Sequence, residues 1–197
     1  MLACQVIGNY YFFMVLSVLS KTRQPTKDVT MSVGTRPPLL ELGGEEAFRD
    51  YEKEFGRPYQ NQRIVNILGK IVEFPGSSCW HVCFKRDETD RSARRRRDIW
   101  SQERANRIPW ILAALTDPKT EVRPNDKDLI NRLNYLLVVD AEPLNGLPTE
   151  YYIVVTERIN KTTVRFITAY QITLQEWRGY KKAGAALYPI KEKKDKA

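Results

Sequence analysis

His81 is the only histidine among the 197 residues, and its side chain is the first to consider for proton transfer. Imidazole titrates near pH 6.5 in reference peptides, which suits both steps of a proton-transfer reaction at neutral pH. Cleavage of a phosphodiester without a metal needs a base, a cation to stabilise the extra charge on phosphorus, and a donor that orients or protonates. Arginines downstream of His81 and a late segment ending in threonine and tyrosine offer candidates for the last two roles. A partly buried histidine with a purely structural role is the alternative.

Cys79, His81 and Cys83 follow one another at intervals of two, which would place the three side chains on one face of a strand. No fourth ligand accompanies them, so reduced, partly buried thiols in a cytoplasmic protein are favoured over a zinc site. The chain also lacks the G-x-x-x-x-G-K-[ST] phosphate-binding loop and the H-E-x-x-H zinc motif. We therefore expect no metal and no cofactor.

The chain is basic, with 32 Lys and Arg against 24 Asp and Glu and a net charge of +8. Such a balance suits a polyanionic partner, although a basic soluble protein without one is the plainer interpretation. A run of four arginines, in the same way, is either a solvated face or a loop that holds phosphates. The residues expected to bind RNA are Lys85, Arg86, Arg94, Arg95, Arg96, Arg97, Arg104 and Arg165.

Alternating and β-branched runs predict the strands that must position these residues. Residues 151–156 and 163–170 flank a polar break and predict an antiparallel hairpin. Period-two geometry places Phe166 and Thr168 on one face of the second strand. Residues 77–85 also alternate, which predicts a strand in the same sheet with His81 on its more polar face. Residues 133–139 predict a further strand.

Helical periodicity appears in residues 45–55, where Gly56 and Pro58 end the pattern. Residues 98–115 predict two helical pieces that meet at Arg107-Ile108, because Pro109 is tolerated only at a helix start. Residues 174–184 predict a short polar helix. Residues 62–72 fit a short helix or a helix that runs into a strand, and residues 121–131 are polar without a clear period.

Residues 1–44 are expected to be an apolar N-terminal segment and linker, residues 45–190 a single domain, and residues 191–197 a charged tail. The apolar stretch 2–19 approaches the roughly 20 residues that span a membrane, but a positive segment does not precede it. A start at Met14 or Met31, or a loosely attached strand, is favoured over a membrane anchor.

Two motifs, Arg107-Ile108-Pro109-Trp110-Ile111 and Phe166-Ile167-Thr168-Ala169-Tyr170, carry a resemblance to a known superfamily. Their order and the residues around them resemble the phage-associated barnase–EndoU–colicin E5/D–RelE-like nucleases, over about residues 77–190. These are small ribonuclease domains of mobile elements and toxin modules. The resemblance implies N-terminal helices packed on a curved antiparallel sheet of about four strands.

The resemblance also implies a cleft lined by a strand histidine, a helix arginine and a late-strand hydroxyl. Those roles fall on His81, Arg107 (or Arg104) and Thr168, with Tyr170 close behind. The expected protein is thus an α+β, metal-independent endoribonuclease that leaves a 2′,3′-cyclic phosphate, with RNA and an inhibitor (immunity or antitoxin) protein as partners. The alternatives are a non-catalytic RNA-binding or nucleic-acid-binding module, or a phage structural protein with a degenerate site.

Overall fold

The computed structural model describes residues 36–86, 97–125, 131–141, 146–182 and 185–188. Contacts divide the chain into two units, Met1–Ser32 and Val33–Ala197, and every described residue belongs to the second. The apolar stretch 2–19, Arg94, Arg95, Arg96 and the tail 191–197 lie outside the described residues. No helix among the described residues has the length and apolar character that crossing a membrane requires.

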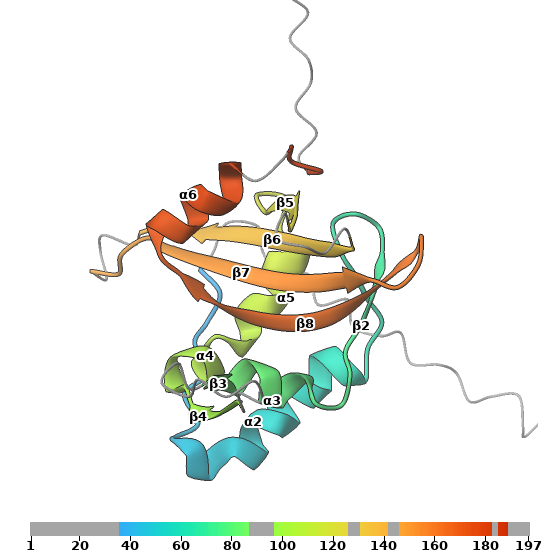
Figure 1. Ribbon diagram of the computed structural model, residues 1–197. Coiled ribbons are helices and arrows are strands. Elements are labelled where there is room, and N and C mark those ends of the chain that lie inside the picture. Colours follow the sequence, from blue (N-terminus) through green and yellow to red (C-terminus); the bar gives the residue numbers. More distant parts are fainter. Residues whose placement is uncertain (1–35, 87–96, 126–130, 142–145, 183–184, 189–197) are drawn as a thin grey trace, which may run out of the picture. The chain divides into compact units, whose positions relative to one another are not determined.

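Helices and strands alternate irregularly along the chain, as Figure 1 shows. The helical elements are the 3-10 turn η1 (Glu45–Ala47), α2 (Phe48–Phe55), the π turn η2 (Gly56–Gln60), α3 (Ser78–Cys83), α4 (Gln102–Asn106), α5 (Ile108–Thr116) and α6 (Leu174–Lys182). The strands are β1 (Ile64–Val65), β2 (Ile71–Glu73), β3 (Phe84–Arg86), β4 (Arg97–Trp100), β5 (Glu121–Pro124), β6 (Arg132–Val139), β7 (Glu150–Arg158) and β8 (Thr163–Ile172).

The main sheet has the strand order β1-β2-β8-β7-β6-β5, and only the β2–β8 pair is parallel. The central β7–β8 hairpin is antiparallel, as its sequence predicts, with Val154 opposite Ala169. The α+β class and the curled, mostly antiparallel sheet are confirmed. The described sheet contains six strands rather than the expected four, because β1, β2 and β5 are too short to give a sequence signal.

The two faces of the sheet pack against different helices. Tyr152 and Val154 of β7 lie in the larger core, which also contains buried residues of α2, α3 and α5. Ile153 and Val155 point to the other face, where Trp177 of α6 packs against them. Figure 1 shows α5 behind the long strands β6 and β7, and the apolar sequence of this helix explains its burial. The larger face therefore carries most of the hydrophobic stabilisation.

A β-bulge changes the faces of β8 in a way that alternation alone does not predict. Phe166 pairs with Thr156, but Thr168 pairs with the preceding residue of β7, Val155. Ile167 is thus an extra residue, and side chains beyond it change faces. The prediction that Phe166 and Thr168 share one face is wrong for this reason.

The segment that contains His81 is helical, so the prediction of a strand over residues 77–85 is wrong. Cys79, Val82 and Cys83 are buried at positions i, i+3 and i+4, which is the stripe of a helix. The alternation in sequence is short enough to fit either period. The chain becomes extended only at Phe84, and β3 pairs with β4 in a separate two-stranded ribbon. His81 therefore does not lie in the sheet of the β7–β8 hairpin.

Residues 62–72 form the β1–β2 hairpin rather than a helix. The Asn66 side-chain oxygen accepts hydrogen bonds from the backbone N–H groups of Leu68 and Lys70, both at 3.0 Å, and Gly69 has a φ of 71°. These features close a tight turn that side-chain periodicity does not show. Residues 97–100 and 121–124 are also strands, whereas the helix junction at Arg107 and the helix at 174–182 agree with the sequence.

Candidate functional site

The predicted catalytic residues Thr168 and His81 come close through the main chain of His81. The Thr168 hydroxyl donates a hydrogen bond to the His81 carbonyl oxygen at 3.2 Å, because α3 packs against β8. The Cys79 and Cys83 sulfurs lie 3.8 Å apart in the core, and their contact, with burial, raises the pKa of the Cys83 thiol. In the described ranges, no group of three histidine, cysteine, aspartate or glutamate side chains is placed to hold a metal.

The Arg107 guanidinium, predicted to contact phosphate, is bound to the carboxylate of Glu150 instead. Its Nε lies 2.9 Å from Glu150 Oε2, and its side chain is 11% exposed. The Gln171 amide donates to the same oxygen at 3.0 Å, and Arg36 binds Oε1. Both oxygens of this buried carboxylate are therefore occupied. We call Arg36, Arg107, Glu150 and Gln171 the Glu150 clamp.

The clamp also fixes part of the segment that sequence places in a linker. Arg36 and Arg107 lie over the Trp110 ring at 5.4 and 5.1 Å, and Trp110 Nε1 donates to the Pro37 carbonyl at 3.0 Å. Residues 36–44 thus contribute contacts to α5 and β7. The sequence does not predict this arrangement, because Glu150 and Arg36 are more than 100 positions apart and neither belongs to a motif.

Arg104 and Tyr170, two further predicted site residues, contact each other. The Arg104 guanidinium lies 5.0 Å from the centre of the Tyr170 ring, and burial lowers the pKa of this arginine. The Tyr170 and Tyr180 hydroxyl oxygens are 3.4 Å apart. Tyr170 thus packs between α4 and α6. The side chains of Arg107, Thr168 and Tyr170 thus contact other parts of the protein. The catalytic roles of these three residues and of His81 stay a prediction.

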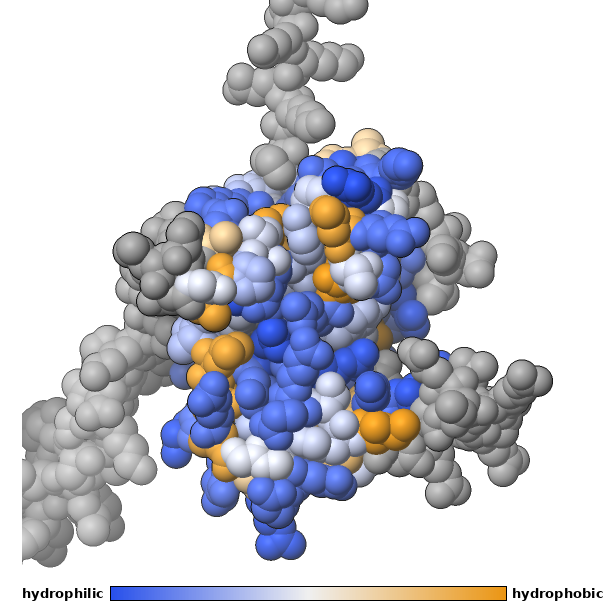
Figure 2. All heavy atoms as spheres, turned by 90° about the vertical axis from the view of Figure 1, so that its left-hand side faces the viewer, coloured by the Kyte–Doolittle hydropathy of each residue, from blue (hydrophilic) through white to orange (hydrophobic). Residues whose placement is uncertain are grey.

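The predicted RNA-binding residues are distributed over separate surfaces. Lys85 and Arg86 are exposed on β3, where Arg86 pairs in register with Arg97. Trp80, 40% exposed, stacks on Phe84 of the same ribbon at 3.7 Å. Figure 2 shows the face that carries α6 and this ribbon, and it is mainly hydrophilic with small, separate apolar patches. This face carries the exposed cations Lys85 and Arg86 and the exposed ring of Trp80. Sequence motifs do not show that these side chains share one face.

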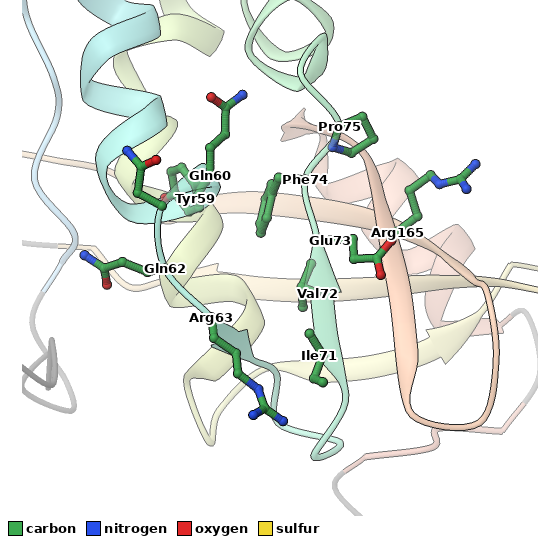
Figure 3. Close-up of a pocket in the computed structure, with 11 residues that line it drawn as sticks. Tyr59, Gln60, Gln62, Arg63, Ile71, Val72, Glu73, Phe74, Pro75 and Arg165 are labelled. Atoms are coloured by element: carbon green, nitrogen blue, oxygen red, sulfur yellow. The ribbon is translucent and has the colours of Figure 1, made fainter. Parts of the chain in front are cut away.

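Arg165 belongs to a different surface, an open groove of about 780 Å³ beside β2. One wall is residues 59–63 and the other is residues 71–75, with Arg165 of β8 beyond it, as Figure 3 shows. We call it the β2 groove. Its apolar floor is closely packed, because the Phe74 ring packs on Phe166 and on Tyr59, with ring centres 5.0 Å apart in both pairs. Sequence reasoning identified Arg165 here and missed the rest of the groove.

The polar side chains of the β2 groove differ from those of the Glu150 clamp in having no protein partner. Within the part of the chain that the structure describes, six of them form no side-chain hydrogen bond and no ion pair. They are Gln60, Asn61, Gln62, Arg63, Glu73 and Arg165. Because all six are exposed, their donors and acceptors face water or a ligand.

More cations surround the groove at the same end of the sheet. Lys70 donates to the Lys161 carbonyl, and the Ile71 N–H donates to the Thr162 carbonyl at 2.9 Å, which joins β2 to the β7–β8 turn. Arg158 lies at the end of β7, opposite Val164. We call this set the basic end; its members are Arg63, Lys70, Arg158, Lys161 and Arg165. None of the five forms an ion pair with another described residue.

No protein family, no curated protein and no solved structure matches this chain. The resemblance to the nuclease superfamily therefore rests on the two sequence motifs, residues 107–111 and 166–170, and the residues around them. The geometry of the described residues is the remaining basis for a functional conclusion.

Proposed function

We propose that this protein binds single-stranded RNA through the basic end and the β2 groove. The observation that carries the proposal is the set of five cations without ion pairs to described residues at one end of the sheet, two of which, Arg63 and Arg165, line the open groove. An arginine or lysine in water keeps its full charge available for a phosphate, whereas a paired arginine such as Arg107 must first give up its carboxylate. The net charge of +8 adds long-range attraction for a polyanion.

The choice of RNA, and of a single strand, has two supports. The motifs at residues 107–111 and 166–170 resemble those of ribonuclease domains, whose substrate class is RNA. Protein side chains cannot enter the deep, narrow major groove of duplex RNA, so sequence is read mostly on unpaired bases. The side chains of the β2 groove would therefore contact the bases of a single strand. The exposed cations Lys85 and Arg86 lie on a separate surface, the β3–β4 ribbon, and are not part of this proposal.

Cleavage of the RNA is a separate matter. His81 lies on α3 instead of the sheet, and Arg107 and Thr168 have protein partners, so the predicted catalytic set loses the geometry that motivated it. Binding is therefore the function that the geometry supports best. Cleavage to a 2′,3′-cyclic phosphate, an inhibitor protein and a cytoplasmic location stay predictions. Incubation of total RNA with the protein in EDTA, beside a His81→Ala variant, tests the first of them.

The test of binding is the fluorescence anisotropy of a labelled 20-nucleotide RNA over a range of salt concentrations. Each phosphate neutralised contributes about −0.7 to the slope of log K against log salt, so five contacts give about −3.5 and roughly a 100-fold loss between 50 and 200 mM salt. An Arg158→Gln, Lys161→Gln double variant should reduce the slope by about 1.4. Arg49→Gln with Arg178→Gln, which removes two exposed cations elsewhere, is the control. No binding at 50 mM salt, or equal slopes for both variants, would contradict the proposal.

A further inference from the structure

The β2 groove has the size and composition of a small-ligand site as well as a basic surface. Its volume of about 780 Å³ lies within the roughly 300–1,000 Å³ of ligand pockets. The floor is apolar and the rim carries three amides, two guanidinium groups and one carboxylate. A flat electrostatic surface for a polyanion needs only the cations, so the amides and the carboxylate call for a separate explanation.

Local backbone geometry keeps the groove open. The π turn η2 closes with a hydrogen bond from the Asn61 N–H to the Gly56 carbonyl at 3.2 Å, and such turns are frequent at functional sites. The β1–β2 hairpin pairs at only two positions, and the walls separate beyond the Ile64–Val72 pair. Figure 3 shows Phe74 in the space between these walls.

Both walls are anchored to the rest of the fold. The Ile67 N–H donates to the Leu115 carbonyl at 2.8 Å, and the Tyr59 hydroxyl donates to the Ile108 carbonyl at 2.7 Å, so α5 holds the wall of residues 59–63 and the hairpin. The second wall, β2, pairs with β8 from Ile71 to Glu73. A ligand would therefore meet a preformed site and would not have to order it.

Glu73 decides which kind of ligand fits. It lies opposite Arg165 in the β2–β8 register, and Figure 3 shows its carboxylate directed toward the strand that carries Arg165. A carboxylate only accepts hydrogen bonds and repels a bare phosphate. The same group accepts well from the amino group of a nucleobase. The amides of Gln60 and Gln62, on the opposite wall, can both donate and accept, as a base edge requires.

We propose that the β2 groove binds one ribonucleotide and prefers a base that carries an amino group. Arg165, or Arg63 from the opposite wall, binds the phosphate, while Glu73 and the amides of residues 60–62 contact the base and ribose. This inference rests on the RNA-binding function proposed for the same end of the sheet. The nucleotide is either one unit of a bound RNA strand or a free nucleotide, and the two sources share this chemistry.

The experiment is a calorimetric titration of the full chain with GMP, CMP, UMP and inorganic phosphate, beside anisotropy with oligo(C) and oligo(U). We expect CMP and GMP to bind at least about fivefold tighter than UMP, and oligo(C) tighter than oligo(U), since one good contact to a base discriminates by roughly 5- to 150-fold. Inorganic phosphate should bind most weakly. Preference in the oligonucleotides without binding of free nucleotides would assign the site to an RNA strand; tight binding of free nucleotides would assign it to a soluble ligand.

Variants separate this inference from the general RNA-binding function. Glu73→Gln should reduce the preference between CMP and UMP to within about twofold and leave the salt slope unchanged, whereas Arg165→Gln should weaken every nucleotide and lower the slope. Glu54→Gln and Arg178→Gln are controls with the same changes of charge at helix positions outside the groove. If the wild type shows a steep salt slope but no base preference, or if Glu73→Gln keeps the full preference, the inference fails and the RNA-binding function stands. If neither RNA nor any nucleotide binds, both fail.

Discussion

The two ends of the β7–β8 hairpin carry the same residue types in opposite circumstances. At one end, Arg36 and Arg107 share the buried carboxylate of Glu150. At the other, Arg63, Arg165 and Glu73 line an open groove and form no ion pair with another described residue. The number of arginines is similar, and what differs is whether the fold already supplies their partners. The comparison teaches that the candidate site lies where the charges are unpaired.

The physical reason is the cost of removing a charge from water. A guanidinium that is about one-tenth exposed, as Arg36 and Arg107 are, is stable only with a carboxylate and hydrogen bonds around it. An exposed guanidinium needs no partner and adds little to stability. The charges of the Glu150 clamp therefore stabilise the fold, whereas those of the β2 groove are available to bind a ligand.

Glu150→Gln should have the largest effect on stability. It leaves two buried arginines without their carboxylate, and breaking such a pair costs about 3–5 kcal/mol. Urea denaturation measures the change, and the weakened clamp should also alter Trp110 fluorescence because both arginines lie over that ring. RNA affinity, measured well below the denaturation midpoint, should stay unchanged.

Glu54→Gln is the matched control, since its partner Arg57 is an exposed helix neighbour at i+3. We expect a change below about 0.5 kcal/mol. Equal effects of the two variants would remove the distinction between a structural and an available set of charges.

Stability should also fall at alkaline pH on the groove side. Burial raises the pKa of Tyr135 to about 12, and the hydroxyl of this residue accepts a hydrogen bond from Asn66 in the β1–β2 turn at 2.8 Å. Because the folded pKa exceeds the unfolded value of about 10, the stabilisation is complete below pH 10 and is lost as the pH rises toward 12. The full loss, above pH 12, is about 2–3 kcal/mol, and about half of it is reached at pH 11.

Urea denaturation at pH 8.5 and pH 11 measures this loss in the wild type and in Tyr135→Phe. The variant is less stable at pH 8.5, because the Asn66 amide loses its acceptor, but it should lose less on going to pH 11. An identical decrease in both proteins would show that ionisation of Tyr135 does not cause the loss of stability.

Gly69→Ala should have the smallest of these effects. An added Cβ would meet no atom within 4 Å, so the cost of about 1 kcal/mol comes only from the φ of 71°. The substitution should also weaken nucleotide binding, since this turn sets the β1–β2 hairpin. Gly179→Ala, in helix α6 with the same free space, should instead stabilise by about 0.5–1 kcal/mol and leave binding unchanged. Destabilisation by both variants would indicate a steric cause.

Long, strongly patterned segments were predictable from the sequence. The β7–β8 hairpin, β6, the helix ending at Phe55 and the helix junction at Arg107 follow from local periodicity, Gly and Pro positions. The short segments were not, because three or four residues fit either period. Residues 78–83 show this best, since the helical stripe Cys79, Val82 and Cys83 coexists with an alternating pattern.

By itself, the sequence determined the α+β class, the central hairpin, the basic charge and the absence of the phosphate-loop and H-E-x-x-H motifs. Only the tertiary structure decided which charges are paired. Arg107 and Arg165 look alike in sequence, but α5 brings the first to Glu150 while the short pairing of β1 and β2 leaves the second beside an open groove. The reason is that a charge interacts over a few ångströms of space, and the folded chain alone sets which residues lie within that distance.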